Sequence, residues 1–222
     1  MLSPNPMSQK NSTYILKTLR VFPEKFLSRS KSLLNPISYL LIKSKINPNT
    51  LSTLALITGL GAGVLFFFRH PLWAGILIVI CGILDVLDGK VAEETHQKSL
   101  YGAHLDSTLD RYSEFFIYLG IAYYFKDHWA VWITFWTILG SFAVSYTRAK
   151  AESLGIECKI GSMQRGERMI SLSAAAIIGP LLKIFDPFMI VVLILIAVVS
   201  NITVIQRILY VRKAEKLIKK GD

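Results

Sequence analysis

Four aspartates in an otherwise apolar part of the chain have the spacing expected of a metal site. Asp85 and Asp88 are three residues apart, and Asp106 and Asp110 are four apart, so each pair shares one face of a helix. Burying four negative charges is too costly unless cations neutralise them. Oxygen ligands, with no His or Cys in ligand spacing, favour Mg2+ or Mn2+ over zinc. The alternative, in which the carboxylates only cap or solvate a loop between helices, stays open at this point.

Residues 85–110 resemble the signature of the CDP-alcohol phosphotransferase family, D-x-x-D-G-x-x-A-R-x8-G-x-x-x-D-x-x-x-D. Gly89, Ala92 and Gly102 occupy the other fixed positions, and the single departure is Glu93 in place of the arginine. Members of the family are polytopic membrane enzymes that move the phosphatidyl group of a CDP-lipid onto an alcohol and release CMP. The resemblance therefore implies a phosphatidyltransferase.

The resemblance also implies a role for each aspartate. Asp85, Asp88 and Asp106 are expected to be metal ligands. Asp110 is expected to be a ligand and also the general base that takes the proton of the acceptor hydroxyl. Two Mg2+ or Mn2+ ions would bind the pyrophosphate oxygens of the donor and offset the charge that develops on departing CMP. We expect direct in-line attack, because the nearby hydroxyl residues have no adjacent His to activate them.

The nucleotide side of the donor is assigned to residues near the first two expected spans. Residues 47–52 open the first span and resemble the family segment beside the cytidine pocket, although Asn49 or Thr50 can equally cap the helix. Glu93 would repel a phosphate unless it turns away and Lys90, one turn earlier, supplies the positive charge. The residues expected to bind the CDP-lipid are Asn49, Thr50, Asp85, Gly89, Lys90, Ala92 and Gly102.

A second motif bears on the acceptor. Residues 145–155, followed by Gly161 and by Arg-Gly-Glu-Arg at 165–168, are similar to the phosphatidylinositol-phosphate synthases and their archaeal counterparts, whose acceptor already carries a phosphate. The basic residues of that subgroup's phosphate pocket map to Arg148, Arg168 and Arg207. A guanidinium presents a fork of donors that suits phosphate oxygens. The alternative is that these arginines only snorkel to the membrane interface at the ends of spans.

Composition indicates a membrane protein with one domain. The 222 residues are 52% hydrophobic, with a mean hydropathy of +0.45, which is too apolar for most soluble folds. The predicted fold is all-α and polytopic, with six transmembrane helices and an N-terminal cytosolic juxtamembrane amphipathic helix. The six apolar stretches lie roughly at 50–68, 72–92, 102–125, 129–150, 168–185 and 188–210.

The net charge of +10 is distributed in a way that predicts the orientation. Lys and Arg gather in residues 1–46, around 148–168 and after residue 207. The positive-inside rule then places both termini and the two long connections, around 90–111 and 148–168, in the cytosol. We divide the chain into a basic interfacial segment (1–46), a six-helix catalytic domain (47–213) and a basic cytosolic tail (214–222). The basic residues flank spans and form no groove-sized array, so no nucleic-acid partner is expected.

The depth of the charged residues places the site. With a rise of about 1.5 Å per residue, both aspartate pairs and the three arginines reach one level just inside the cytosolic boundary. The predicted function is transfer of a phosphatidyl group from CDP-diacylglycerol to a phosphorylated polyol, with inositol phosphate as the first choice, by a homodimeric integral membrane enzyme. The alternatives are glycerol 3-phosphate or another alcohol as acceptor, a pseudo-enzyme suggested by Glu93, and a small cation transporter.

Overall fold

The computed structural model describes residues 34–158 and 160–221, and within these residues the regular structure is entirely helical. The prediction of an all-α fold is therefore confirmed for the described part of the chain. The helices are α3 (Asn35–Lys43), α4 (Pro48–Phe67), α5 (Pro71–Glu94), α6 (Leu100–Tyr124), α7 (Ala130–Ser153), α8 (Arg165–Leu181) and α9 (Phe185–Gly221).

Local sequence signals mark where the helices begin. Proline stands in the first turn of α4 and of α5, where its missing N–H leaves no hydrogen bond unmade. The Asn47 side chain accepts a hydrogen bond from the Asn49 amide at the start of α4. The Ser99 hydroxyl accepts one from the Gly102 amide at the start of α6. These caps fix the starts of two helices that carry predicted site residues.

Four helices in the described residues, α4, α5, α7 and α9, are long and apolar enough to cross a membrane. These helices make the chain an integral membrane protein. The two other long helices, α6 and α8, do not meet this criterion because of their charged residues or their length. Helix α6 carries Asp106, Asp110, Arg111 and Glu114, and α8 has only 17 residues and begins with charged side chains.

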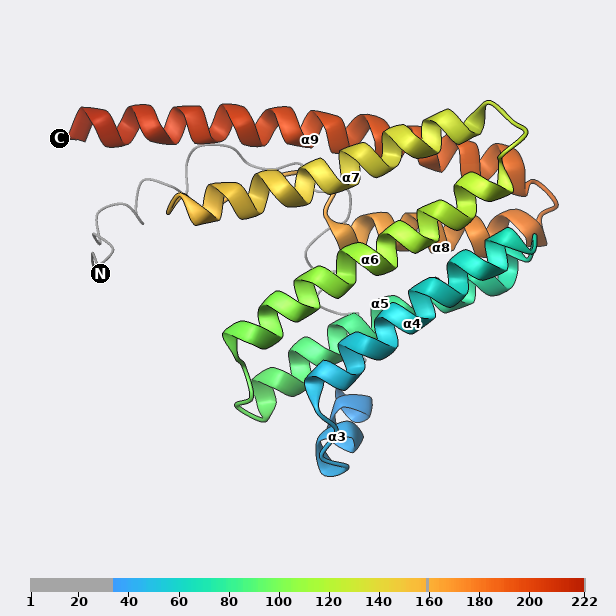
Figure 1. Ribbon diagram of the computed structural model, residues 1–222, viewed down its shortest axis with the longest axis horizontal. Coiled ribbons are helices and arrows are strands. Elements are labelled where there is room, and N and C mark those ends of the chain that lie inside the picture. The colour runs from blue at the N-terminus through green and yellow to red at the C-terminus, as the bar shows by residue number, and fades with distance from the viewer. Residues whose placement is uncertain (1–33, 159, 222) are drawn as a thin grey trace.

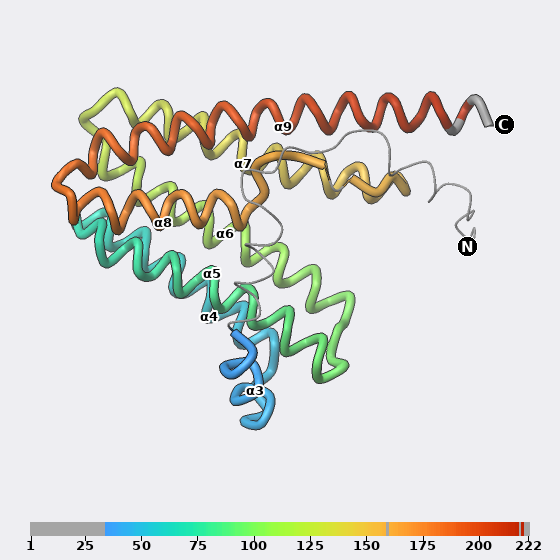
Figure 2. The backbone as a smooth tube through the Cα atoms, turned by 180° about the vertical axis from the view of Figure 1, so that it is seen from behind, coloured from blue at the N-terminus to red at the C-terminus, as the bar shows by residue number. Residues whose placement is uncertain are grey.

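Figure 1 shows α4, α5 and α6 side by side, while α7 runs along α9. The view from behind in Figure 2 places α8 between these two groups, in contact with α5 on one side and α9 on the other. Leaving their shared connection at residues 125–129, α6 and α7 diverge (Figure 1). The ends of α5, α6 and α8 that carry the predicted site residues therefore lie on the same side of the bundle as the C-terminal end of α7.

Small residues allow α4 and α6 to cross closely. A Cβ atom added at Gly120 would lie 2.6 Å from the Gly63 Cα atom, and one added at Gly59 would lie 2.6 Å from the Ser113 Cβ atom. Such approach of backbones is common where small residues line a helix contact within a membrane. The crossing holds α6, with two of the aspartates, against α4.

The described part of the predicted interfacial segment forms α3, and residues 1–33 lie outside the described residues. Leu34, Leu41 and Ile42 pack against a small core that contains Leu51 and Leu87. On the other side of α3, the side chains of Ile37, Tyr39 and Leu40 are exposed. Lys90 also donates a hydrogen bond to the Asn35 side chain, so α3 is attached to the site-bearing end of α5.

Candidate active site

Three of the four aspartates form a compact cluster. Carboxylate oxygens of Asp85 and Asp88 on α5 and of Asp106 on α6 all lie within 4.8 Å of one another. One oxygen of Asp106 is buried and has no hydrogen-bond partner among the described residues. A buried, unpaired carboxylate oxygen is costly unless a cation binds it. The donor set is purely oxygen, so the cluster fits a hard divalent cation such as Mg2+ or Mn2+.

Asp88 is the most buried of the three, with 4% of its surface exposed. The Ser52 hydroxyl on α4 donates a hydrogen bond of 2.6 Å to its Oδ2 atom. This bond fixes the direction of the carboxylate, as hydrogen bonds to metal ligands commonly do. The close packing of α4 on α5 therefore contributes directly to the shape of the cluster.

Asp110 lies beside the cluster and is paired with an arginine. The Arg165 Nη1 atom at the start of α8 is 2.8 Å from Asp110 Oδ1 and 2.6 Å from Asp85 Oδ1. Arg165 also donates to the Ser113 hydroxyl at 3.2 Å. Arg165 lies within the second motif but was not among the residues predicted to bind the acceptor phosphate. Its place three residues before Arg168 was the signal available.

The three arginines predicted to bind the acceptor phosphate each have a partner. Arg168 is fully buried and forms a bidentate pair with Glu114. Arg207 donates to the backbone carbonyls of Ile160 and Val144.

Arg148 pairs with Glu152 at 2.8 Å, and 44% of its side-chain surface is exposed. Among the described residues, Arg165 is the arginine that contacts the aspartates. The predicted phosphate pocket therefore stays a prediction, with Arg148 as its most accessible member.

The residues predicted to bind the nucleotide lie where α4 and α6 begin and where α5 ends. Asn49 and Gly102 are neighbours, since a Cβ atom added at Gly102 would lie 3.3 Å from the Asn49 Oδ1 atom. Gly89 is exposed, with open space where a Cβ atom would stand. Thr50 is also exposed, and Ala92 is partly buried.

Glu93 in this region is exposed and lies 3.1 Å from the Lys98 Nζ atom in an ion pair. Its carboxylate therefore has a basic partner within the α5–α6 connection.

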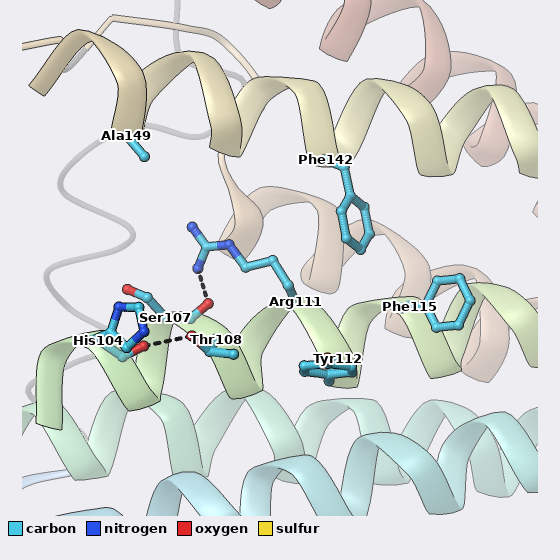
Figure 3. A pocket seen from close by; sticks show the side chains of 8 residues that line it. All are labelled: His104, Ser107, Thr108, Arg111, Tyr112, Phe115, Phe142 and Ala149. Atoms are coloured by element: carbon cyan, nitrogen blue, oxygen red, sulfur yellow. Dashed lines mark hydrogen bonds between the residues drawn. The ribbon is translucent and has the colours of Figure 1, made fainter. Parts of the chain in front are cut away.

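A separate cavity of about 580 Å3 lies between α6 and α7. Figure 3 shows the Arg111 side chain extending from α6 toward α7, with Phe115 and Phe142 at one end and His104 at the other. The rings of Phe115 and Phe142 meet edge to face. The cavity is lined by His104, Ser107, Thr108, Arg111, Tyr112, Phe115, Phe142 and Ala149. On a helix these α6 positions face away from Asp106 and Asp110, so the cavity is distinct from the aspartate cluster.

The family model of the CDP-alcohol phosphatidyltransferases matches residues 45–211. The archaetidylinositol phosphate synthase of Pyrococcus horikoshii is 36% identical over 190 residues, which cover 85% of this chain and 96% of that protein.

A crystal structure of the Mycobacterium tuberculosis phosphatidylinositol phosphate synthase with CDP-DAG bound superimposes with a TM-score of 0.72. The sequence identity is 27%, and the match covers 79% of this chain and 92% of the other. The same enzyme in complex with manganese and citrate matches with the same TM-score and identity, covering 79% of this chain and 87% of the other.

The chain belongs to the CDP-alcohol phosphatidyltransferase family. The matched region contains all seven residues of the signature that the chain retains, from Asp85 to Asp110. The predicted family is thus confirmed, and nothing in these comparisons supports the cation transporter.

Proposed function

We propose that this protein transfers the phosphatidyl group of CDP-diacylglycerol to the hydroxyl of a phosphorylated polyol, with inositol phosphate as the preferred acceptor, and releases CMP. The observation that carries this proposal is the cluster of Asp85, Asp88 and Asp106, with Asp110 and Arg165 directly beside it. Relatives over most of the chain are synthases of inositol phosphate lipids.

The donor is proposed to bind where α4 and α6 begin and where α5 ends. Asp85, Asp88 and Asp106, assisted by Asp110, would hold Mg2+ or Mn2+, with two ions expected. A bound divalent cation supplies neutralisation of the pyrophosphate and of the developing charge on CMP. The neighbours Asn49 and Gly102, together with Thr50, Gly89, Lys90 and Ala92, are proposed to surround the nucleotide.

Asp110 is proposed to be the general base. Asp110 lies beside the three clustered carboxylates, and the Arg165 Nη1 atom, 2.8 Å from its Oδ1 atom, orients it. A charged carboxylate in this place can accept the proton of an acceptor hydroxyl as the new bond to phosphorus forms.

The acceptor phosphate is proposed to bind near the start of α8. The Arg165 Nε atom is buried and has no hydrogen-bond partner among the described residues, so this donor is available to an anion. Arg148 is exposed enough to join it. Arg168 and Arg207 are the other members expected from the resemblance, but Arg168 is enclosed with Glu114 and would reach a phosphate only if that ion pair opened.

The finer topology is also a proposal. We propose that α6 and α8 cross the membrane together with α4, α5, α7 and α9, because both pack against spans on the inside of the bundle. Six spans then leave both termini and the active site on the cytosolic side. Residues 1–46 would be interfacial, 47–213 catalytic and 214–222 a cytosolic tail. A homodimer is expected by analogy with the family.

A CMP-release assay with purified protein tests the function. The protein would be given CDP-diacylglycerol, Mn2+ and one acceptor at a time: inositol phosphate, free inositol, glycerol 3-phosphate or serine. We expect CMP and a lipid product with inositol phosphate. A preference for free inositol would contradict the phosphorylated acceptor, and no CMP with any acceptor would contradict the enzyme.

A further inference from the structure

Two ion pairs join α6 to α8, one helical turn apart. The outer pair is Asp110 with Arg165, and the inner pair is Glu114 with Arg168. Glu114 follows Asp110 by four residues and Arg168 follows Arg165 by three, so the partners lie on matching faces of the two helices. The two helices are thus connected by a ladder of charged side chains, with the outer rung at the aspartate cluster.

The inner ion pair is buried, and each nitrogen of the Arg168 guanidinium already donates a hydrogen bond. Arg168 is 0% exposed and Glu114 2%. The Arg168 Nε atom donates to Glu114 Oε1 at 2.6 Å and Nη2 donates to Oε2 at 2.9 Å. Nη1 donates to the Met163 carbonyl oxygen at 3.1 Å. An acceptor phosphate could reach this guanidinium only by breaking a buried ion pair, which is strongly unfavourable.

Apolar packing holds α6 and α8 mainly to other helices. The close crossing of α6 is with α4, and Gly75 of α5 lies against Ala176 of α8. At the other end of α8, Gly179 packs on Phe185. The polar ladder therefore contributes to the position of the first turn of α8 relative to α6, and this turn carries Arg165.

We propose that Glu114 and Arg168 are a positioning pair that holds Arg165 between Asp85 and Asp110. This inference rests on the proposed function and goes beyond it, since it gives Arg168 a role other than contact with the acceptor. Arg165 shares the Asp85 carboxylate with any cation bound there, so the ladder has two effects. It orients Asp110 for proton removal, and it weakens the binding of divalent cations.

The test compares Glu114→Gln, Arg168→Met and the double variant, with Glu215→Gln as control. The control makes the same chemical change in the exposed pair of Glu215 with Lys219. Mn2+ binding is measured on purified protein by the electron paramagnetic resonance signal of free Mn2+. Thermal unfolding, kcat and both KM values are measured on the same samples.

Loosening the ladder releases Arg165 from Asp85, so each single variant should bind Mn2+ about tenfold more tightly, as expected for loss of one competing charged hydrogen bond. The value of kcat should fall by at least about tenfold, because Arg165 no longer orients Asp110. Any rise in the acceptor KM should be equal in Glu114→Gln and Arg168→Met, because it would come from the displaced Arg165. The double variant leaves no uncompensated charge, so it should regain thermal stability but keep the altered Mn2+ affinity and kcat. The control should match the wild type throughout.

Two results would overturn the proposal. If the variants unfold earlier but keep wild-type Mn2+ affinity and kcat, the pair is structural only. If Arg168→Met raises the acceptor KM alone, Arg168 binds the acceptor. Should the wild type release no CMP with any acceptor, the proposed function fails, and the Mn2+ affinities alone then decide whether the pair positions Arg165.

Discussion

Gly63 and Gly120 lie against each other where α4 crosses α6, so closely that a Cβ atom on Gly120 would lie 2.6 Å from the Gly63 Cα atom. Ser52 on α4 is hydrogen-bonded to Asp88 on α5. The crossing of α4 with α6 therefore holds this pair close to Asp106 on α6. The distance between the backbones of α4 and α6 is therefore part of the geometry of the candidate metal site.

Gly120→Ala should destabilise the protein, because backbone atoms of α4 cannot yield to the added methyl group. Overpacking of this kind costs about 1–3 kcal/mol. Thermal unfolding in detergent measures the effect. Gly82→Ala, on α5 with open space around its Cβ position, is the matched control and should not lower the unfolding temperature. Equal stability of the two variants would contradict the close crossing.

The aspartates should separate into two groups by Mn2+ binding. Asp85→Asn, Asp88→Asn and Asp106→Asn should each lose Mn2+ affinity and turnover together, because these residues form the cluster. Asp110→Asn should retain most of its Mn2+ affinity, because Asp110 only assists the three clustered ligands, while turnover falls by about 100-fold or more, as for loss of a general base. Free Mn2+ is measured by electron paramagnetic resonance, and turnover by CMP release.

Asp127→Asn, an exposed residue in the connection between α6 and α7, is the control for these four variants and should behave as wild type. Excess chelator should abolish activity of the wild type. Full activity in chelator would refute the metal site.

Glu93→Arg tests the departure from the family signature. Glu93 is exposed and pairs with Lys98, so the change removes a negative charge near the proposed donor site and restores the positive charge usual in the family signature. We expect a lower apparent KM for CDP-diacylglycerol. Glu94→Arg, the same change one residue later, should leave that KM unchanged. Inactivation by Glu93→Arg would show instead that Glu93 has acquired a role of its own.

Arg148→Gln should raise the KM for inositol phosphate about tenfold or more, as expected for one charged hydrogen bond to phosphate, with little change in the KM for CDP-diacylglycerol. Arg148→Lys should recover only part of the loss, because an ammonium cannot reproduce the bidentate geometry. Arg212→Gln, at an exposed position on α9, is the control. An unchanged acceptor KM in Arg148→Gln would remove Arg148 from the phosphate pocket.

The segment that connects α7 to α8 should be held in place by Arg207, which donates to the Ile160 carbonyl at 2.9 Å. Cys158 in this segment is fully buried, and burial raises the pKa of its thiol. A raised pKa lowers the fraction of reactive thiolate at neutral pH, so Cys158 should react slowly with maleimide. In a Cys81→Ser background, Arg207→Ala should speed the reaction by about tenfold or more, because the lost charged hydrogen bonds no longer hold the segment closed.

The reaction rate should rise with pH in both proteins, since deprotonation produces the thiolate. Arg212→Ala is the control and should leave the rate unchanged. Fast labelling of Cys158 with Arg207 present would contradict the prediction that Arg207 holds the segment between α7 and α8 in place.

Helix positions and the aspartate cluster could be predicted from the sequence because both depend on local spacing. The apolar stretches correspond to α4 through α9, and two carboxylate pairs at helical spacing necessarily share a face. The predicted positions of the helix ends were less accurate. The last helix was expected to end near residue 210 but continues to Gly221, because charged residues after the apolar stretch still form helix well.

The partners of the arginines could not be predicted, because they depend on how α8 is rotated against α6. Arg165 and Arg168 are close in sequence, yet one contacts the aspartates and the other is enclosed with Glu114. Glu114 itself carried no signal, since a lone acid in an apolar stretch does not reveal its partner. The cavity between α6 and α7 likewise arises from the divergence of two helices, which no local pattern encodes.

The order of synthesis gives the Arg165 pairing a further consequence. A chain leaves the ribosome from its N-terminus, so the hairpin of α5 and α6 is complete before Arg165 has been made. Until α8 arrives, the carboxylates of that hairpin must take up protons or cations, or stay in the aqueous interface. The helix that brings Arg165 to the aspartates is therefore made after them. In a chain truncated before α8, the four aspartates would depend on protons, cations or water at the membrane surface.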